Sequence, residues 1–505
     1  MSKKNKILQV SALLMLCTVI SKILGFGREL LVAYKFGAGS ISDAFVLTNS
    51  IPTLIFTSLA TAININFIPC YQRIESSGEK SRFTSNLTNI SLLIMSAGCL
   101  LVELFPRIVL KFFASGLPDE TERISVLMLR IVIFSIYPII LAYLYQAYMQ
   151  ANSFYIGTAL YGVVTNIVVI LFTFISTAEH SFLLSVGTVT AHLLGLGMIL
   201  FGVRLKAPFR YTPRIDVREE HTRNMVILTI PLLIEDLASS MSLIVDRNLA
   251  SFLDEGTISG LGYAGTIGNI ASSMIATAIM TATFPFFSKL LAGGKKEEFS
   301  AEFRKYASAL CFLLSPVSVF LIFNANDIVA LIFRHGQFSD TAAKVVSESM
   351  ICYAVGVLPM GMQSYFIRGF YAMQDTKTPV KIKVFALVCN IVLNLLSVKL
   401  LRHMGIALST SFSYVISYFL LLHCLKKHGT ENTGRITAEC AVSLLLSVIP
   451  AVILYFSFGR LIVISSLLVR TLFGGLAFTL MYFGLVMLFR RKQLTVVLDL
   501  RKNRS

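Results

Sequence analysis

The sequence contains no tryptophan and is poor in charged residues, which make up 14% of the 505 residues against about 25% in a typical soluble domain. Acidic residues are especially scarce, with 27 Asp and Glu against 44 Lys and Arg, so the net charge is +17. Hydrophobic residues reach 55%, and the mean hydropathy is +0.75. This composition excludes a soluble enzyme or a nucleic-acid binder with a basic surface. It predicts a polytopic membrane protein with basic loops.

Sequence motifs of soluble catalysis are also missing. No Walker A motif and no HExxH motif occurs, which argues against direct ATP drive and against a zinc protease. No CxxC pair occurs, so we expect no disulfide framework and no thiolate metal site. We expect every cysteine to be a small buried hydrophobe. The cysteines lie in or beside apolar runs, at Cys17, Cys70, Cys99, Cys311, Cys352, Cys389, Cys424 and Cys440.

Apolar runs long enough to cross a bilayer recur along the whole chain, because about 20 apolar residues span the hydrocarbon core. Alternate connections are rich in Lys and Arg, which predicts that both termini are cytoplasmic. After Lys3, Lys4 and Lys6 no cleavage site follows, so the first run is expected to be an uncleaved helix. The fourteen predicted spans are approximately 7–34, 42–71, 84–113, 123–149, 155–176, 181–203, 224–252, 257–291, 303–324, 342–373, 379–400, 405–425, 437–459 and 461–489.

The sequence also contains an internal repeat. Gly39-Ser40-Ile41-Ser42 is echoed by Gly256-Thr257-Ile258-Ser259, and Met149 and Asn166 are echoed 224 positions later by Met373 and Asn390. A unit of six helices predicts two parallel repeats related by an axis along the membrane normal, as in alternating-access transporters. The predicted division is an N-terminal six-helix lobe at 1–203, a cytoplasmic basic linker at 204–223, a C-terminal six-helix lobe at 224–425, and two extra helices with a basic cytoplasmic tail at 426–505.

Some ionisable residues fall inside predicted spans, where charges are costly and usually line a cavity or meet a partner. The first span contains Lys22, Arg28 and Glu29, and Lys22 and Glu29 share a helix face. These residues predict a cationic patch for an anionic substrate, because the planar guanidinium of arginine suits phosphate. The alternative is a structural Arg28–Glu29 ion pair. Asp43, near the start of the second span, has the alternative of a helix N-cap.

A second group of polar residues predicts a cation site. Asp246 lies in the seventh span, Asn390 and Asn394 lie on one face of the eleventh, and Thr410 lies in the twelfth. A carboxylate, two amides and a hydroxyl supply hard oxygen ligands for Na⁺ or a proton relay. The alternative for the asparagines is hydrogen bonding between helices.

Several motifs are similar to those of the MurJ (MviN) family, within the superfamily of multidrug, oligosaccharidyl-lipid and polysaccharide exporters. They are Ser21-Lys22-Ile23-Leu24-Gly25-Phe26-Gly27-Arg28-Glu29, Ser42-Asp43-Ala44-Phe45, Ile51-Pro52, Phe67-Ile68-Pro69, Asp246-Arg247-Asn248-Leu249-Ala250-Ser251, and the stretch from Arg368 to Val380. The last is the most specific, and the resemblance covers essentially the whole chain.

The resemblance implies fourteen helices and a flippase, not an enzyme, that moves undecaprenyl-pyrophosphate-linked peptidoglycan precursor (lipid II) across the bacterial inner membrane for cell-wall synthesis. It implies that Lys22, Arg28, Glu29 and Asp43 bind the substrate and that Na⁺, bound at Asp246, Asn390, Asn394 and Thr410, is the coupling ion. It implies no other cofactor and no nucleic acid. Membrane lipids and cell-wall synthesis proteins are the further expected partners.

The chain departs from the family pattern at a few site positions. Phe56 and Thr266 stand where the family usually has arginine, Lys22 stands for arginine, and Glu29 stands for aspartate. The alternatives that stay open are a paralogue that exports another polyprenyl-linked oligosaccharide and a non-transporting membrane scaffold of wall synthesis. A cationic-drug exporter would favour an acidic cavity, and a membrane glycosyltransferase would need a catalytic motif with a sizeable loop; the sequence shows neither.

Overall fold

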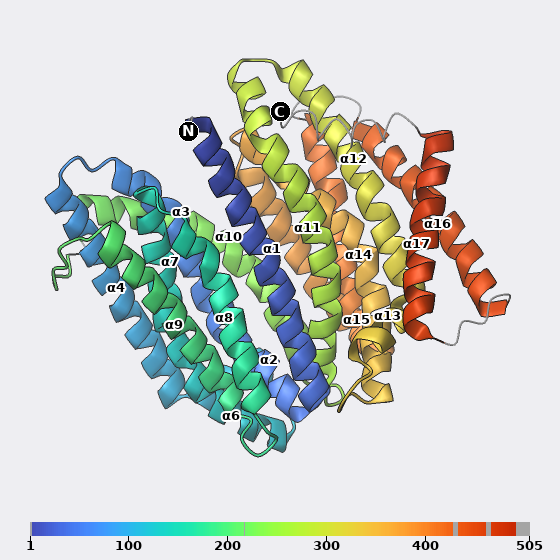
Figure 1. Cartoon of the computed structure of the whole chain (residues 1–505), viewed down its shortest axis with the longest axis horizontal. Coiled ribbons are helices and arrows are strands. Elements are labelled where there is room, and N and C mark those ends of the chain that lie inside the picture. Colours follow the sequence, from blue (N-terminus) through green and yellow to red (C-terminus); the bar gives the residue numbers. More distant parts are fainter. Residues whose placement is uncertain (1–2, 217, 428–432, 461–465, 491–505) are drawn as a thin grey trace. The chain divides into compact units, whose positions relative to one another are not determined.

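The structure is a computed structural model that describes residues 3–216, 218–427, 433–460 and 466–490. Within these ranges the secondary structure is helical and contains no strand, as the apolar composition predicts. The chain divides into two compact units, Met1–Ser259 and Gly260–Ser505. Each unit is a bundle of packed helices (Figure 1).

The first unit, here unit 1, contains most of the shorter helices. In chain order they are α1 (Lys3–Phe36), α2 (Ser40–Pro52), the π-helical η1 (Thr53–Thr57), α3 (Ser58–Gln72), α4 (Ser77–Leu104), α5 (Pro106–Phe113), α6 (Asp119–Val132), the 3₁₀ turn η2 (Ile133–Ser135), α7 (Ile136–Ala151), α8 (Ile156–Ile175), α9 (Leu183–Lys206), α10 (Glu220–Ala250) and the start of α11 (Thr257–Ala292). The second unit, unit 2, contains the rest of α11, α12 (Lys296–Phe323), α13 (Ala325–Phe333), α14 (Asp340–Ala372), α15 (Lys377–Lys427), α16 (Thr433–Arg460) and α17 (Leu467–Phe489).

Among the described residues, eleven helical segments are long and apolar enough to cross a membrane. One of them, α15, is two helices that meet at Arg402, whose φ of 52° is not helical. This break separates the predicted spans 379–400 and 405–425. Helices α1 and α10 also cover predicted spans, although they are not among the eleven. The chain is therefore a multi-pass membrane protein, and the count of fourteen stays a prediction.

Helix α10 packs within unit 1 along its length. The amide of Asn66 on α3 donates to Thr229 Oγ1 (3.3 Å), and Asn248 near the end of α10 donates to the carbonyl of Phe112 (3.3 Å). The boundary between the two units therefore lies after the end of α10, between Ser259 and Gly260. The predicted lobe boundaries at 204–223 and 426 stay predictions.

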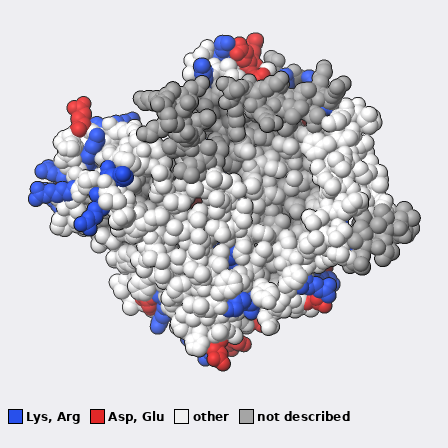
Figure 2. Space-filling model, in the orientation of Figure 1, with Lys and Arg blue, Asp and Glu red and all other residues white. Residues whose placement is uncertain are grey.

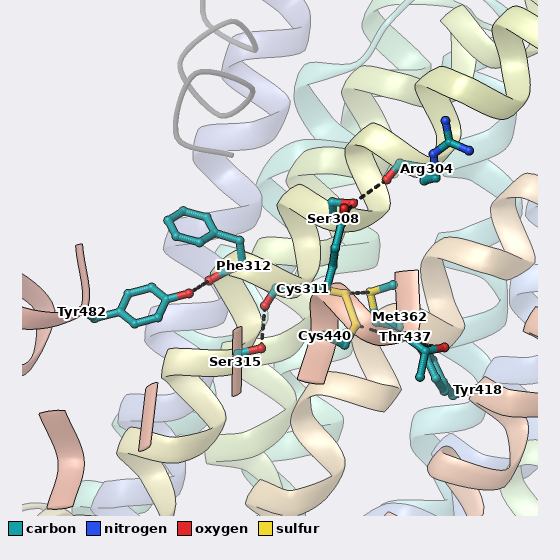
Figure 3. Close-up of a disulfide and its surroundings, with 11 residues drawn as sticks. Arg304, Ser308, Cys311, Phe312, Ser315, Met362, Tyr418, Thr437, Cys440 and Tyr482 are labelled. Carbon is teal, nitrogen blue, oxygen red and sulfur yellow. Dashed lines mark hydrogen bonds between the residues drawn. A yellow bond between two sulfur atoms is a disulfide. The ribbon is translucent and has the colours of Figure 1, made fainter. Parts of the chain in front are cut away.

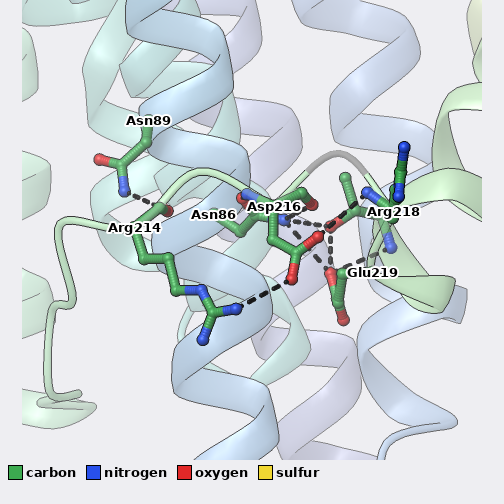
Figure 4. Close-up of polar contacts among 7 residues, drawn as sticks. Asn86, Asn89, Arg214, Asp216, Arg218 and Glu219 are labelled. Carbon is green, nitrogen blue, oxygen red and sulfur yellow. Dashed lines mark hydrogen bonds and ion pairs between the residues drawn. The ribbon is translucent and has the colours of Figure 1, made fainter.

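The linker 204–223 is held against α4 (Figure 4). Asn86 Nδ2 donates to the carbonyl of Asp216 (2.7 Å), and Asn86 Oδ1 accepts from the Asp216 N–H (2.8 Å). Asn89 Nδ2 donates to the carbonyls of Thr212 (3.0 Å) and Arg214 (2.9 Å). Basic side chains gather over the part of unit 1 where this linker lies (Figure 2). The described part of the linker, residues 204–216 and 218–223, is therefore a strap bound to α4, and its arginines are exposed.

One helix in each unit ends in a left-handed turn. At the end of α7, Ser153 has φ 67° and the next N–H, of Phe154, bonds the carbonyl of Met149 (2.8 Å). At the end of α14, Gln374 has φ 61° and the next N–H, of Asp375, bonds the carbonyl of Phe370 (3.0 Å). This left-handed closure is a common way to satisfy the last carbonyls of a helix. The same kind of turn thus ends one helix in each unit, although the two turns are 221 positions apart and do not coincide with the Met149–Met373 echo at 224.

Aromatic side chains fill the core of unit 2. Phe303 on α12 stacks on Tyr365 of α14 with ring centroids 4.6 Å apart, and the Tyr365 hydroxyl donates to the Phe303 carbonyl (2.8 Å). Tyr482 on α17 contacts Phe312 of α12 in the same manner, with a hydrogen bond of 2.8 Å to its carbonyl. These contacts bury the phenol groups with a hydrogen-bond partner, which avoids the cost of an unsatisfied hydroxyl.

A disulfide joins Cys311 on α12 to Cys440 on α16 (Figure 3). The expectation that every cysteine is a reduced hydrophobe is therefore wrong for this pair. The two cysteines are 129 residues apart, and the packing of α12 on α16 brings their Cα atoms to 5.2 Å. Such a pairing leaves no short spacing pattern in the sequence. Six cysteines are free: Cys17, Cys70, Cys99, Cys352, Cys389 and Cys424.

Candidate functional site

Arg28 and Glu29 form a charged pair in α1, with Arg28 Nη2 3.8 Å from Glu29 Oε1. Both side chains are partly accessible, at 28% and 29% exposure. A guanidinium carries five N–H donors, so this single contact leaves donors for an anionic ligand. Lys22 lies seven residues before Glu29 on the same face of α1 and is also partly exposed. These three of the four predicted substrate residues lie on α1, in the span where the sequence already placed them, and their role in binding stays a prediction.

A polar seam holds α1 against α8 beside these charges. Asn166 Nδ2 donates to the carbonyl of Ser21 (3.1 Å) and to the carbonyl of Gly162 in its own helix (2.8 Å). A Cβ at Gly162 would lie 2.4 Å from Ser21 Oγ, so the two helices approach closely there. Lys35 Nζ donates to the carbonyls of Thr173 (3.1 Å) and Ser176 (2.6 Å) near the end of α8. Helix α1 is therefore anchored on both sides of the charged pair.

A histidine on α9 adds a titratable group that the sequence did not identify. His192 Nδ1 lies 2.8 Å from the Tyr161 hydroxyl of α8. The histidines of this chain have no ligand spacing, so only the packing of α8 on α9 reveals this pair. The pair joins α8 to α9 within unit 1.

Asp43 makes a different set of contacts from the other predicted substrate residues. Its carboxylate accepts hydrogen bonds from the backbone N–H groups of Gly256 and Ser259, each 2.7 Å, and from the Ser259 hydroxyl, 2.6 Å. The side chain is buried, with 4% exposure. It therefore caps the first turn of α11, whose N–H groups have no partner within the helix. The sequence singled out Gly256 and Ser259 only as part of the repeat.

The residues around Asp43 strengthen this connection. Gly256 has φ +85°, and a Cβ there would lie 2.5 Å from the carbonyl oxygen of Ala38. Glu255 accepts hydrogen bonds from Ser40 of α2 and from Thr121 of α6 (3.2 Å to the latter). The segment before α11 is thus clasped by α2 and α6, directly before the chain enters unit 2 at Gly260. We call these contacts the Asp43 latch.

Neither of the two positions where arginine is usual supplies a cation. Phe56 in η1 is 8% exposed and packs in the hydrophobic core of unit 1. A Cβ at Gly98 of α4 would lie 2.6 Å from its ring, so the ring fills the space beside that glycine. Thr266 Oγ1 donates to the carbonyl of Gly262 one turn earlier in α11 (2.9 Å).

The predicted cation ligands fall in both units. In unit 2, Asn390 Nδ2 donates to Thr410 Oγ1 (3.4 Å), and Asn394 Nδ2 donates to Asn390 Oδ1 (3.3 Å). Both asparagines are fully buried where the two helices of α15 fold back on each other at Arg402. This group of amide and hydroxyl oxygens fits the oxygen preference of Na⁺. Asp246 is in unit 1, where it is 6% exposed. Within the described residues there is no cluster of His, Cys, Asp and Glu that could hold a metal ion.

Comparison with known proteins matches residues 32–479 to the family model described as lipid II flippase MurJ. A probable lipid II flippase MurJ from Buchnera aphidicola subsp. Baizongia pistaciae is 26% identical over 424 residues, covering 81% of each chain. Another, from Thermotoga maritima, is 25% identical over 430 residues, covering 84% of this chain and 87% of its own. A solved structure titled lipid II flippase MurJ, inward closed conformation, matches with a TM-score of 0.83 and 24% identity, covering 96% of this chain and all of that one. The fold, the helix-borne charges and the match over most of the chain agree, and the chain belongs to the MurJ lipid II flippase family.

Proposed function

We propose that this chain is a flippase that carries lipid II from the cytoplasmic to the outer leaflet of the bacterial inner membrane by alternating access. Family membership and the names of the relatives support the cargo. The observation that carries the proposal is the Arg28–Glu29 pair, which is partly accessible within a helix that covers a predicted span. A charged residue inside a membrane-spanning segment is energetically costly and therefore usually has a functional role.

In this proposal Arg28 binds the pyrophosphate of the cargo. The guanidinium donates paired hydrogen bonds to phosphate oxygens, while Glu29 and the α1–α8 seam hold it in place. Lys22 adds a second positive charge on α1. Glu29 offsets part of the positive charge of Arg28 and so lowers its affinity for the pyrophosphate. A carrier requires such moderate affinity, because it must release the cargo after transport.

The Asp43 latch supplies the moving part. The chain passes from unit 1 into unit 2 immediately after Ser259, the residue that Asp43 binds. A carboxylate at the N-terminus of α11 favours one position of that helix through its N–H groups and dipole. We place both termini in the cytoplasm, so that this latch lies at the outer face. Transport would break and re-form it in every cycle, and Na⁺ at Asn390, Asn394, Thr410 and Asp246 would be the coupling ion.

Translocation in cells tests this function. A bacterium depleted of its own flippase should recover outer-leaflet lipid II when it expresses this chain, as measured by accessibility of labelled precursor to an externally added reagent. Arg28→Ala should abolish this recovery, and Arg28→Lys should restore part of it because the charge remains while the fork is lost. Arg107→Ala is the matched control, because Arg107 forms a 3.6 Å ion pair with Glu122 but its side chain is 78% exposed.

Membrane levels of each variant are measured in parallel. Recovery by Arg28→Ala equal to the unchanged chain would show that the pair is only structural. Restored wall synthesis without lipid II translocation would support a scaffold in place of a flippase.

The surroundings of Phe56 favour a second candidate, export of another polyprenyl-linked oligosaccharide. The Phe56 ring lies in the core and the Thr266 hydroxyl bonds its own helix, so neither position adds positive charge. A cargo that carries less negative charge would suit a chain that lacks these two cations. Failure to move lipid II, together with recovery of a different lipid-linked glycan in a strain lacking that exporter, would favour this candidate.

A further inference from the structure

A short helix of unit 1, α5, takes no part in the function proposed above. Helix α4 covers the predicted span 84–113 only as far as Leu104, and the backbone leaves the helix at Phe105, with φ −129° and ψ 48°. Helix α5 follows and lies between the membrane-spanning segments that contain α4 and α6. With 8 residues it is about 12 Å long, too short to cross a bilayer. Its side chains therefore decide where it lies.

One face of α5 is fixed to unit 1. Leu110 and Phe113 are buried and belong to the hydrophobic core of this unit. The side-chain amide of Asn248, near the end of α10, donates to the carbonyls of Lys111 (3.5 Å) and Phe112 (3.3 Å) at the end of α5. These contacts set the rotation of α5 about its own axis. The directions of its remaining side chains then follow from helix geometry.

The two exposed faces of α5 differ in chemistry. Arg107 and Lys111, one turn apart, form a basic face, and Ile108 and Phe112 form an apolar face. Ile108 is 67% exposed and Phe112 is 59% exposed, although both are large hydrophobic side chains. Successive residues point about 100° apart around a helix, so the basic and apolar faces lie side by side and away from the buried one. This division is typical of a helix at a membrane surface.

The basic face of α5 is directed at water. Arg107 Nε lies 3.6 Å from Glu122 Oε1, in the first turn of α6. Asp119 and Glu120 in the same turn are exposed, and carboxylates are costly in hydrocarbon, so this turn lies at an aqueous end of the bundle. The Lys111 ammonium forms no hydrogen bond or ion pair with the part of the chain that the structure describes. The apolar face lies about 100° further around the helix, away from this charged turn.

The apolar face of α5 follows a surface that faces the bilayer. Leu93, Leu100 and Leu104 of α4 are each more than half exposed and lie within a membrane-spanning segment. Phe105, at the break between α4 and α5, is also more than half exposed. Exposed apolar side chains therefore follow the chain from the span into α5. A phospholipid offers both of the required chemistries at this level, a phosphate for lysine and acyl chains for phenylalanine.

We propose that α5 lies at the boundary between the headgroups and the hydrocarbon of the bilayer and binds phospholipid there. Ile108 and Phe112 lie among the acyl chains near the glycerol groups, and the Lys111 ammonium lies at the level of the phosphates. A phosphate is common to zwitterionic and anionic phospholipids, so no particular headgroup is required. Because Asn248 ties α10 to α5, the bilayer surface also sets the level of that helix end. The proposal concerns lipid around the protein and stands apart from the identity of the cargo.

The absence of tryptophan allows a direct test, because a single introduced tryptophan is then the only indole in the full chain. The Phe112→Trp chain is reconstituted in phosphatidylcholine vesicles whose acyl chains are brominated either near the glycerol or near the chain ends. Bromine quenches tryptophan emission on contact. The Phe112→Trp chain should lose more emission with bromine near the glycerol than with bromine near the chain ends. Phe113→Trp is the matched control, because Phe113 is buried in unit 1, and neither lipid should quench it.

Two further variants make the test sharper. Leu93→Trp gives the depth reference, because Leu93 is exposed near the middle of α4 and should be quenched more by bromine near the chain ends. In the Phe112→Trp chain, Lys111→Glu should reduce quenching near the glycerol, because phosphate repels the new carboxylate, and Lys111→Arg should preserve it.

The outcomes separate the possible environments of α5. Quenching of Phe112→Trp that is equal in the two vesicles, or stronger with bromine near the chain ends, would place α5 inside the hydrocarbon and overturn the proposal. No quenching in either vesicle would mean that water or another protein covers this face, which also overturns it. Unchanged quenching after Lys111→Glu would remove the lysine from the binding site. If Phe113→Trp does not fold, the comparison of Phe112→Trp with Leu93→Trp decides.

Discussion

The carboxylate of Asp43 accepts two hydrogen bonds from Ser259, one from its backbone N–H and one from its hydroxyl, across 216 residues of sequence. A third bond, from the Gly256 N–H, completes the cap on α11. The chain thus ties the start of α2 to the last residues of unit 1.

Replacing Asp43 tests the strength of the latch. Asp43→Ala should lower the free energy of unfolding by about 1–3 kcal/mol for each buried donor left unpaired. Transport should also fall, because the latch no longer favours one position of α11. Thermal unfolding of the purified chain and the translocation assay measure the two effects. Asp119→Asn, an exposed carboxylate at the start of α6, is the control and should change neither.

Gly256 should tolerate no side chain. Gly256→Ala forces a positive φ of 85° on alanine and places its Cβ 2.5 Å from the Ala38 carbonyl oxygen. We expect a lower unfolding temperature and loss of transport. Gly197→Ala is the counterpart in α9, where a Cβ meets nothing within 4 Å; it should be neutral or stabilise the helix by about 0.5–1 kcal/mol. Equal behaviour of the two variants would contradict the close approach at Ala38.

Phe56 and Gly98 should be coupled. Gly98→Ala alone should destabilise the chain, because the new methyl group would lie 2.6 Å from the Phe56 ring. The same substitution in a Phe56→Leu background should cost less, since the smaller side chain leaves room. A double-mutant cycle of unfolding free energies measures this, with an expected coupling of about 0.5–3 kcal/mol. Additive effects would show that the ring does not fill this space.

The strap should protect its own arginines from protease. In the unchanged chain, Asn86 and Asn89 hold the backbone around Arg214 and Asp216, although the Arg214 side chain is 81% exposed. Asn86→Ala should release this backbone, and trypsin should then cut the linker faster.

The matched control for the strap is Asn64→Ala. This substitution removes the 2.8 Å hydrogen bond that the Asn64 side-chain amide donates to the Tyr143 carbonyl elsewhere in unit 1. Gel analysis of timed digests at native conditions measures the linker cleavage rate. An unchanged rate in Asn86→Ala would mean that the asparagine does not order the linker.

The sequence by itself determined the helical class and the approximate positions of the helices. Apolar runs report burial in hydrocarbon locally, and Arg402 lies between the predicted spans 379–400 and 405–425. The motif around Arg28 and the echo of Asn166 at Asn390 were also visible, because each lies within a short window of sequence. Such signals depend only on neighbours along the chain.

Only the tertiary structure decided which residues meet. The capping of α11 by Asp43, the disulfide between Cys311 and Cys440, and the Arg470–Asp327 pair join segments more than a hundred residues apart. The interaction of His192 with Tyr161 depends on how α8 and α9 pack against each other. Hydropathy places a helix in the membrane, but it does not choose the helix's neighbours. That choice comes from side-chain packing and from the need to pair every buried polar group.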